Sequence, residues 1–255
     1  MKKKSLALLL ALVTAVAVIP AVPVMAIETS YQTIEMNDNV SQGSTEEADT
    51  YYKFTMEKSG RVNISLNVPN ENAKSGLVKL YEVDGEITGD ELDSRYGTWD
   101  HQSPRGTEVW AYDLLKGEYF LRFYTGYNFS LTLTPEYADS TYEESVYEEN
   151  YNENTAKKIE CNKTIKGALS MNEIDGDFYK LNVGSKGTLK VTVNTKVNDV
   201  QMAIYKAGKT PQTIQLVSGK SVNTLKLDSK GTYYVVVRKD GGTGNYNFKM
   251  KFKKK

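Results

Sequence analysis

Histidine and cysteine, which often serve as catalytic bases, nucleophiles or metal ligands, each occur once in this sequence. His101 stands in the segment GTWDHQSPRGTE and Cys161 stands in IECNKT. Because these residues lie in separate parts of the chain, the sequence offers no Cys–His catalytic pair, and a single histidine excludes a histidine-rich zinc site. Serine and aspartate are plentiful, but the G-x-S-x-G nucleophile motif is absent. The sequence therefore predicts no catalytic residues and no enzymatic activity.

The segment DSRYGTWDHQSPRG in the first half is a candidate for ligand binding, and the second half has no counterpart of similar composition. Tyr96, Trp99 and His101 could form an aromatic platform for a sugar ring or for the side chain of a partner. The alternative is that Trp99 folds back and covers one end of its domain. Both interpretations stay open at the level of the sequence.

A second group of candidate binding residues consists of lysines at alternate positions in otherwise apolar segments: Lys190, Lys249, Lys251 and Lys253. Alternate side chains of a strand point to opposite faces, so the last three are predicted to form an exposed row with steps of about 7 Å. Such a row attracts polyanions, including wall teichoic acids, sulfated glycans and acidic proteins. Two alternatives are that the row attracts the acidic half of the same chain, or that it is an ordinary solvated surface.

Two segments of the first half resemble two segments of the second half, and the strands predicted from them carry the candidate lysines. ADTYYKFTMEKSGRVNISL matches GDFYKLNVGSKGTLKVTV, so that Gly60 corresponds to Gly187. KGEYFLRFYTGYNFSLTLT likewise matches KGTYYVVVRKDGGTGNYNFKMKFK, so that Phe129 corresponds to Phe248. Both glycines precede predicted strands, where a residue without a Cβ can adopt a positive φ. In the second match, Lys249, Lys251 and Lys253 correspond to three neutral residues of the first half: Ser130, Thr132 and Thr134.

Apolar and polar residues alternate with a period of two in both halves, which indicates half-buried strands. Short strands separated by turn signals are typical of β-sandwiches. The sequence therefore predicts an all-β fold with two tandem copies of one sandwich. The predicted organisation is a signal peptide, a first domain, an acidic linker and a second domain, with these bounds: residues 1–26, 27–137, 138–156 and 157–255.

Charge is divided unevenly between the halves, although the whole chain has 32 basic and 32 acidic residues. Residues 27–154 contain 9 Lys and Arg against 25 Asp and Glu, a net charge of −16. Residues 155–255 contain 20 against 7, a net charge of +13. Such asymmetry points to charged partners or to attraction between the halves.

The pattern GALSMNEIDGDFYKLNVGSKGTLKVTV…KGTYYVVV…GNYNFKMKF resembles the bacterial pre-peptidase C-terminal domain family, which includes the collagen-binding modules of secreted clostridial collagenases. The resemblance covers most of residues 155–255 and, more loosely, 38–135. It implies a jelly-roll-like β-sandwich that accompanies secreted enzymes as a non-catalytic binding or targeting module. Because no peptidase domain precedes the modules here, the protein is expected to act in trans or as a free adhesin.

Some members of this family bind calcium at acidic clusters near the N-terminal edge of the module. The matching residues here offer hard oxygen ligands at short spacing: Asn172, Glu173, Asp175 and Asp177. The alternative is that they shape the turn that enters the next strand. Calcium is the only cofactor that the sequence suggests.

Taken together, these features predict a secreted or loosely surface-associated, non-catalytic protein for binding or cell adhesion. Its expected partner is an extracellular polysaccharide, anionic polymer or protein. The alternatives are an accessory or regulatory partner of a secreted peptidase, or a structural, self-associating surface component. Nucleic acid is not expected because no recognition motif is present, and no segment after the signal peptide is long enough to span a membrane. The sequence leaves the oligomeric state open.

Overall fold

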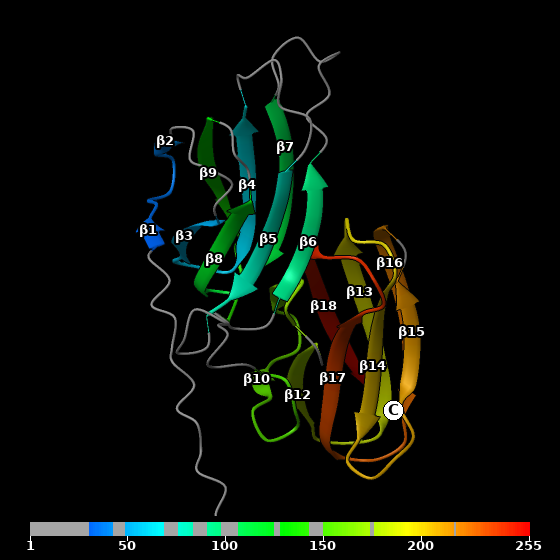
Figure 1. Cartoon of the computed structure of the whole chain (residues 1–255). Helices are drawn as coiled ribbons and strands as arrows, with labels where there is room; N and C mark the ends of the chain where they lie inside the picture. Colours follow the sequence, from blue (N-terminus) through cyan, green and yellow to red (C-terminus); the bar gives the residue numbers. More distant parts are fainter. Residues whose placement is uncertain are drawn as a thin grey trace, which may run out of the picture.

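The computed structural model describes residues 31–42, 49–68, 76–83, 91–97, 107–124, 128–142, 150–173, 176–216 and 218–255. These residues form strands and turns and contain no helix, which confirms the predicted all-β fold. The strands lie in four sheets that form two sandwiches, one from each half of the chain (Figure 1). The predicted signal peptide lies outside the described residues.

The strands of the first sandwich are β1 (Tyr31–Thr33), β2 (Asn39–Gln42), β3 (Asp49–Met56), β4 (Gly60–Asn67), β5 (Gly76–Glu82), β6 (Glu91–Gly97), β7 (Thr107–Leu114), β8 (Gly117–Tyr124) and β9 (Phe129–Tyr137). One sheet has the order β1-β3-β8-β5-β6 and the other has the order β2-β9-β4-β7. Most consecutive strands lie in opposite sheets, as in jelly-roll sandwiches.

The strands of the second sandwich are β10 (Lys157–Ile159), β11 (Thr164–Leu169), β12 (Asp177–Val183), β13 (Gly187–Thr195), β14 (Val200–Lys206), β15 (Gln212–Leu216), β16 (Gly219–Leu227), β17 (Gly231–Lys239) and β18 (Gly244–Lys254). Its sheets have the orders β10-β12-β17-β14-β15 and β11-β18-β13-β16. The strand order of the first sandwich recurs position for position, with β10 in the place of β1 and β18 in the place of β9.

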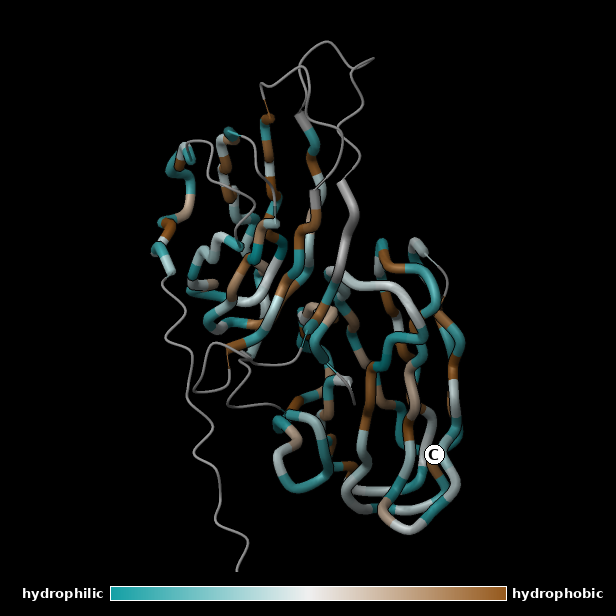
Figure 2. Tube along the Cα trace, viewed as in Figure 1, coloured by the Kyte–Doolittle hydropathy of each residue, from teal (hydrophilic) through white to brown (hydrophobic). Residues whose placement is uncertain are grey.

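Each sandwich encloses a hydrophobic core of its own. Polar and apolar residues alternate along many of the strands (Figure 2), and the apolar ones lie between the two sheets. In β4 the side chains of Val62, Ile64 and Leu66 are fully buried, and in β13 those of Leu189 and Val191 are as well. Burying one such side chain contributes about 1.5–3 kcal/mol to folding.

The pairing register corrects one correspondence that the sequence suggests. Phe129 and Phe248 match as letters, but Phe248 pairs with Val193 in β13, whereas Leu131 pairs with Leu66 in β4. Since β4 and β13 correspond through Gly60 and Gly187, Leu131 holds the place of Phe248. The lysines of β18 therefore correspond to Thr132, Thr134 and Glu136, two residues later than the motif match implies.

The two glycines that begin β4 and β13 both lie close to a neighbouring strand, but they differ in backbone conformation. Gly60 has a φ of +154°, as expected from its place before the strand. Gly187 is not among the residues with a positive φ. A Cβ at Gly187 would collide with the ring of Phe252 and the carbonyl oxygen of Lys253, and a Cβ at Gly60 would collide with the carbonyl oxygen of Glu136. The second glycine therefore permits a close approach of β18.

The segment between the sandwiches, residues 138–156, is predicted to be a solvated linker, yet both of its described ends contact the second sandwich. The backbone nitrogen of Thr141 donates to the carbonyl oxygen of Lys166, and the backbone nitrogen of Lys166 donates to Thr141 Oγ1, both at 2.8 Å. The backbone nitrogen of Phe178 donates to the carbonyl oxygen of Asn150 at 2.7 Å. The described parts of the segment are thus packed against the protein.

The two sandwiches also contact each other directly, through the loop that follows β11 and the turn between β7 and β8. The backbone nitrogen of Met171 donates to the carbonyl oxygen of Asp113 at 2.7 Å, and the Met171 side chain packs against the core of the first sandwich. Thr243 Oγ1 donates to Asp113 Oδ2 at 2.7 Å. Asp113 therefore receives hydrogen bonds from two separate segments of the second sandwich.

The side chain of Asn172 makes three hydrogen bonds across this junction. Its Oδ1 accepts a hydrogen bond from the backbone nitrogen of Leu115 at 3.2 Å. Its Nδ2 donates to Glu82 Oε2 and to the hydroxyl of Tyr119, both at 3.1 Å. One side chain of the second sandwich thereby joins three residues of the first.

Candidate binding surface and cleft

The outer face of the sheet β11-β18-β13-β16 carries a group of lysines, which we call the lysine face: Lys190, Lys220, Lys226, Lys249, Lys251 and Lys253. Strand alternation places their side chains opposite the buried Val191, Phe248 and Met250. The sequence pattern identified four of these lysines. Lys220 and Lys226 were missed because they join the face only through the pairing of β16 with β13.

The strands that carry these six lysines, β13, β16 and β18, contain no acidic residue, whereas Lys166 of β11 on the same side of the sheet is paired with Asp139. None of the six lysines makes an ion pair with another described residue. The face is therefore a continuous patch of positive charge directed at solvent.

Like charges lie directly opposite each other at the centre of this face. Lys190 in β13 is the pairing partner of Lys251 in β18. In the next row, Thr188 lies between Lys226 and Lys253. Directly opposed like charges destabilise an antiparallel pair, because their Cβ atoms are only about 4.5–5.5 Å apart. The fold thus tolerates a local electrostatic cost at this position.

The corresponding face of the first sandwich has balanced charges. Asn63 pairs with Thr134 where the second sandwich has Lys190 and Lys251. Arg61 pairs with Glu136 one row further along, and it also makes two hydrogen bonds to Asp113, Nε to Oδ1 at 3.1 Å and Nη2 to Oδ2 at 2.9 Å. The bond to Asp113 raises the pKa of Arg61, and Glu136 adds to this shift. Among the described residues, the lysines without an ion pair on this pair of corresponding faces belong to the second sandwich.

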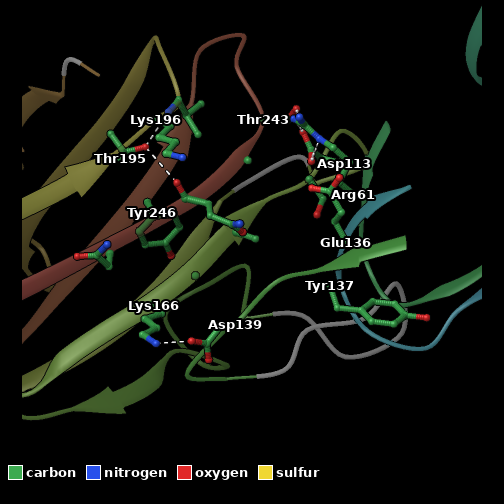
Figure 3. A pocket seen from close by; sticks show the side chains of 18 of the residues that line it. Arg61, Asp113, Glu136, Tyr137, Asp139, Lys166, Thr195, Lys196, Thr243 and Tyr246 are labelled. Atoms are coloured by element: carbon green, nitrogen blue, oxygen red, sulfur yellow. Dashed lines mark hydrogen bonds and ion pairs between the residues drawn. The ribbon is translucent and has the colours of Figure 1, made fainter. Parts of the chain in front are cut away.

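A cleft of about 660 Å³ lies between the two sandwiches (Figure 3). Arg61, Asp113 and Glu136 of the first sandwich line one side of it. The second sandwich contributes polar side chains from the ends of β13 and β18 and the turn after β13, of which Asn194, Lys196 and Asn245 are exposed and Asn247 is half-buried. Figure 3 shows Lys196 across the cleft from Arg61 and Glu136, while the Tyr137 ring points away from the other labelled side chains.

Ion pairs already occupy several of the charged groups around the cleft. Arg61 is paired with Asp113, and Lys166 is paired with Asp139. Lys196 makes no ion pair with another described residue. The cleft therefore offers one unpaired cation and three neutral amides to a ligand.

Much of the predicted aromatic platform lies outside the described residues. Trp99 and His101 are not described, and Tyr96 is placed only as the strand partner of Leu77. Trp110, in β7, is partly buried and packs against the core of the first sandwich. The aromatic platform stays a prediction.

The described members of the predicted calcium cluster point in different directions. Asn172 faces the first sandwich, as described above, and Glu173 Oε2 accepts a hydrogen bond from the backbone nitrogen of Ser170 at 3.1 Å. Asp177 is fully buried and accepts a hydrogen bond from the hydroxyl of Tyr246. Among the described residues, no three His, Cys, Asp or Glu side chains converge as metal ligands, and Asp175 is not described. The described donors do not fit one calcium ion, and calcium binding stays a prediction.

A lysine ammonium lies beside the same loop. Lys239 Nζ donates to the carbonyl oxygens of Ser170 and Met171, the latter at 2.8 Å. Burial lowers the pKa of Lys239, and the charge of Glu173 opposes that shift. Lys239 therefore holds the loop in the conformation that reaches the first sandwich.

The single cysteine shows no sign of activation. Cys161 is half-buried, and burial raises the pKa of its thiol, which favours the unreactive protonated form. The described residues contain no helix that is long and apolar enough to cross a membrane.

Residues 175–239 of this chain match the sequence model of the bacterial pre-peptidase C-terminal domain. This stretch runs from the loop before β12 to the end of β17, within the second sandwich. A comparison with curated protein sequences found no significant match.

Several solved structures resemble the chain. The pre-peptidase C-terminal domain of a collagenase from Bacillus anthracis is 25% identical, with a TM-score of 0.33, and the match covers 38% of this chain and 94% of that one. Tripeptidyl peptidase 2 is 11% identical, with a TM-score of 0.31, and the match covers 88% of this chain and 24% of that one. The exported protein XepA of PBSX is 11% identical, with a TM-score of 0.23, over 86% of this chain and 83% of that one.

Proposed function

We propose that this chain is a secreted, non-catalytic binding protein made of two pre-peptidase C-terminal-like sandwiches, and that its lysine face binds an extracellular anionic polymer. The lysine face carries this proposal, because three neighbouring strands, β13, β16 and β18, present six lysines and contain no acidic residue. The family match in the second sandwich supports a role as a binding module.

The like-charge pair at the centre of the face strengthens the argument. Lys190 and Lys251 repel each other in the free protein, and a bound polyanion would turn that cost into a favourable interaction. Because these ammonium groups are exposed and borne on flexible side chains, they suit a polymer with repeated charges better than one precisely shaped anion. A polysaccharide with acidic groups or a teichoic acid has this character.

The test is binding of residues 27–255 to heparin and to teichoic acid at increasing salt concentrations. The substitution set Lys249→Thr, Lys251→Thr and Lys253→Thr removes half of the lysine face without touching the core. We expect affinity to fall by roughly tenfold or more, because each exposed charge pair is worth up to about 1 kcal/mol. Binding by the unaltered protein should weaken steeply with salt, since screening acts beyond about 10 Å at 0.1 M.

The matched control removes three exposed lysines elsewhere on the second half: Lys158→Thr, Lys209→Thr and Lys230→Thr. Both variants have the same net charge, so only the position of the lost charges differs. If both lose affinity equally, general charge and not this face is responsible. If the unaltered protein binds neither polymer, the proposal fails, and a role beside a secreted peptidase becomes the better hypothesis.

A further inference from the structure

The outward side chains of β13 and β18 continue beyond the lysine face and reach the cleft between the sandwiches. On β18, Asn247 follows the same outward alternation as Lys249 and Lys251. Asn247 pairs with Asn194 of β13, which in turn pairs with Lys220 of β16. Asn194 and Asn247 of this row line the cleft, and Lys220 at its end belongs to the lysine face.

The outward side chains along β18 change from lysines to asparagines as the strand approaches the cleft. From Lys253 to Asn247 the strand advances six residues, or about 20 Å, and its outward side chains change from ammonium to carboxamide. The carboxamides of Asn194, Asn245 and Asn247 can each donate and accept hydrogen bonds. The exposed side chains of Asn194 and Asn245 make no hydrogen bond with another described residue.

The opposite side of the cleft narrows the choice of ligand. Glu136 and the paired Asp113 give that side negative charge, which disfavours a segment that bears only anionic groups. Glu136 Oε1 already accepts a hydrogen bond from Asn63 Nδ2 at 2.8 Å and can accept a further one. A hydroxyl group satisfies both sides, because it can accept from an amide and donate to a carboxylate. Lys196, which makes no ion pair with another described residue, can bind an acidic group of a ligand in the cleft.

We infer that the cleft is the subsite that selects a carbohydrate-containing polyanion, with acidic groups along the lysine face and sugar hydroxyls in the cleft. This inference rests on the proposed function of the lysine face and adds the class of polymer. The site requires both sandwiches, because Arg61 and Glu136 come from the first and the asparagines from the second.

The test compares three polyanions with residues 27–255: polygalacturonate, which has hydroxyl groups, inorganic polyphosphate, which has none, and polyglutamate, an acidic polypeptide. The cleft variant is Asn194→Ala with Asn247→Ala, and the control is Asn154→Ala with Asn198→Ala, at two exposed asparagines outside the cleft. Thermal unfolding of each variant shows that the fold is retained.

We expect the cleft variant to lose about tenfold in affinity for polygalacturonate, the loss that two neutral hydrogen bonds produce. Its affinity for polyphosphate should not change, and the control should bind all three polymers as the unaltered protein does. An equal loss for polygalacturonate and polyphosphate, or no loss for either, would overturn the subsite while leaving the lysine face intact. Polyglutamate binding as tightly as polygalacturonate would also overturn it. If the unaltered protein binds none of the three, the proposed function itself fails.

Discussion

Asn172 of the second sandwich accepts a hydrogen bond from the backbone of Leu115, a buried residue in a turn of the first. The corresponding turn of the second sandwich has a different residue at the position of Leu115. The hydroxyl of Tyr119 donates to the carbonyl oxygen of Leu115, and in the same way that of Tyr233 donates to the carbonyl oxygen of Ser229. Ser229 is exposed. The chain therefore has leucine where a neighbouring sandwich covers the turn and serine where none does.

Replacing Asn172 with alanine is expected to destabilise the protein by about 1–3 kcal/mol, because the backbone nitrogen of Leu115 loses its partner in a buried junction. Urea unfolding measures the effect. Asn154→Ala, at an exposed position, is the control and should change stability by less than about 0.5 kcal/mol. Equal stability of the two variants would show that the junction is not a stable contact in solution.

The in-and-out pattern of the strands could be predicted from the sequence, whereas the pairing between them could not. Alternation alone assigns Lys251 outward and Met250 inward, because side-chain direction depends only on position within one strand. Register depends on which strand lies alongside. The shared letters Tyr-Asn-Phe suggested that Phe129 matches Phe248, but pairing with β4 gives that place to Leu131. A shift of two residues preserves the faces, so the pattern cannot detect it.

The cleft and the junction were also beyond the reach of the sequence. The segment around Asn172 is rich in oxygen ligands, so its composition suggests calcium or a turn. Its contacts are with Leu115 and Tyr119, which lie more than 50 residues earlier in the chain. A local sequence pattern cannot predict contacts with residues so far away in the chain. The clearest available signal was Leu115, an apolar residue directly before the segment KGEYFLRFYTGYNFSLTLT.

Each half is expected to unfold cooperatively by itself, because each has a complete core between two sheets. Residues 27–137 and 157–255, expressed separately, should each show one sigmoidal urea transition. The first fragment should be less stable than the same half in the whole chain, because Leu115 and the core near Met171 lose their cover. A disordered fragment would contradict the assignment of two domains.

Stability should fall as the pH rises from 10 to 12, because burial raises the pKa of Tyr52 to about 12. In the unfolded chain tyrosine ionises near pH 10, so within this window the unfolded state releases a proton that the folded state keeps. The stabilisation is complete below pH 10 and is lost as the pH approaches 12. Burial also raises the pKa of Tyr205 to about 12, and it contributes in the same direction.

The variant Tyr52→Phe isolates the contribution of Tyr52 to this pH dependence. Urea unfolding at pH 9 and pH 11.5 should show a smaller loss of stability for the variant than for the unaltered protein. Among the described residues, the hydroxyl of Tyr52 makes one long hydrogen bond of 3.4 Å, to Gln42 Oε1, so the substitution should cost little at pH 9. If both proteins lose the same stability, other groups cause the alkaline decline.

Lys251→Thr should stabilise the free protein while weakening its binding to polyanions. The substitution removes the charge directly opposite Lys190 and installs the threonine that the first sandwich has at this position, where Asn63 pairs with Thr134. At low salt we expect a gain of about 0.2–1 kcal/mol in the free energy of unfolding, the usual size of a cross-strand pair effect. The gain should shrink in 1 M salt, where the Debye length is about 3 Å.

Lys209→Thr, which removes an exposed lysine from the turn after β14, is the control and should neither stabilise the protein nor alter heparin binding. The double variant Lys190→Asn with Lys251→Thr should be less stabilised than the sum of its single variants, because either substitution alone already removes the repulsion. A surface kept only for solubility has no reason to place two lysines in direct opposition. Loss of heparin affinity together with a gain of stability at Lys251 is therefore the signature that separates a binding face from a merely solvated one. A Lys251→Thr protein that is no more stable at low salt would show that the opposed ammonium groups avoid each other in solution, and the electrostatic argument for the face would fail.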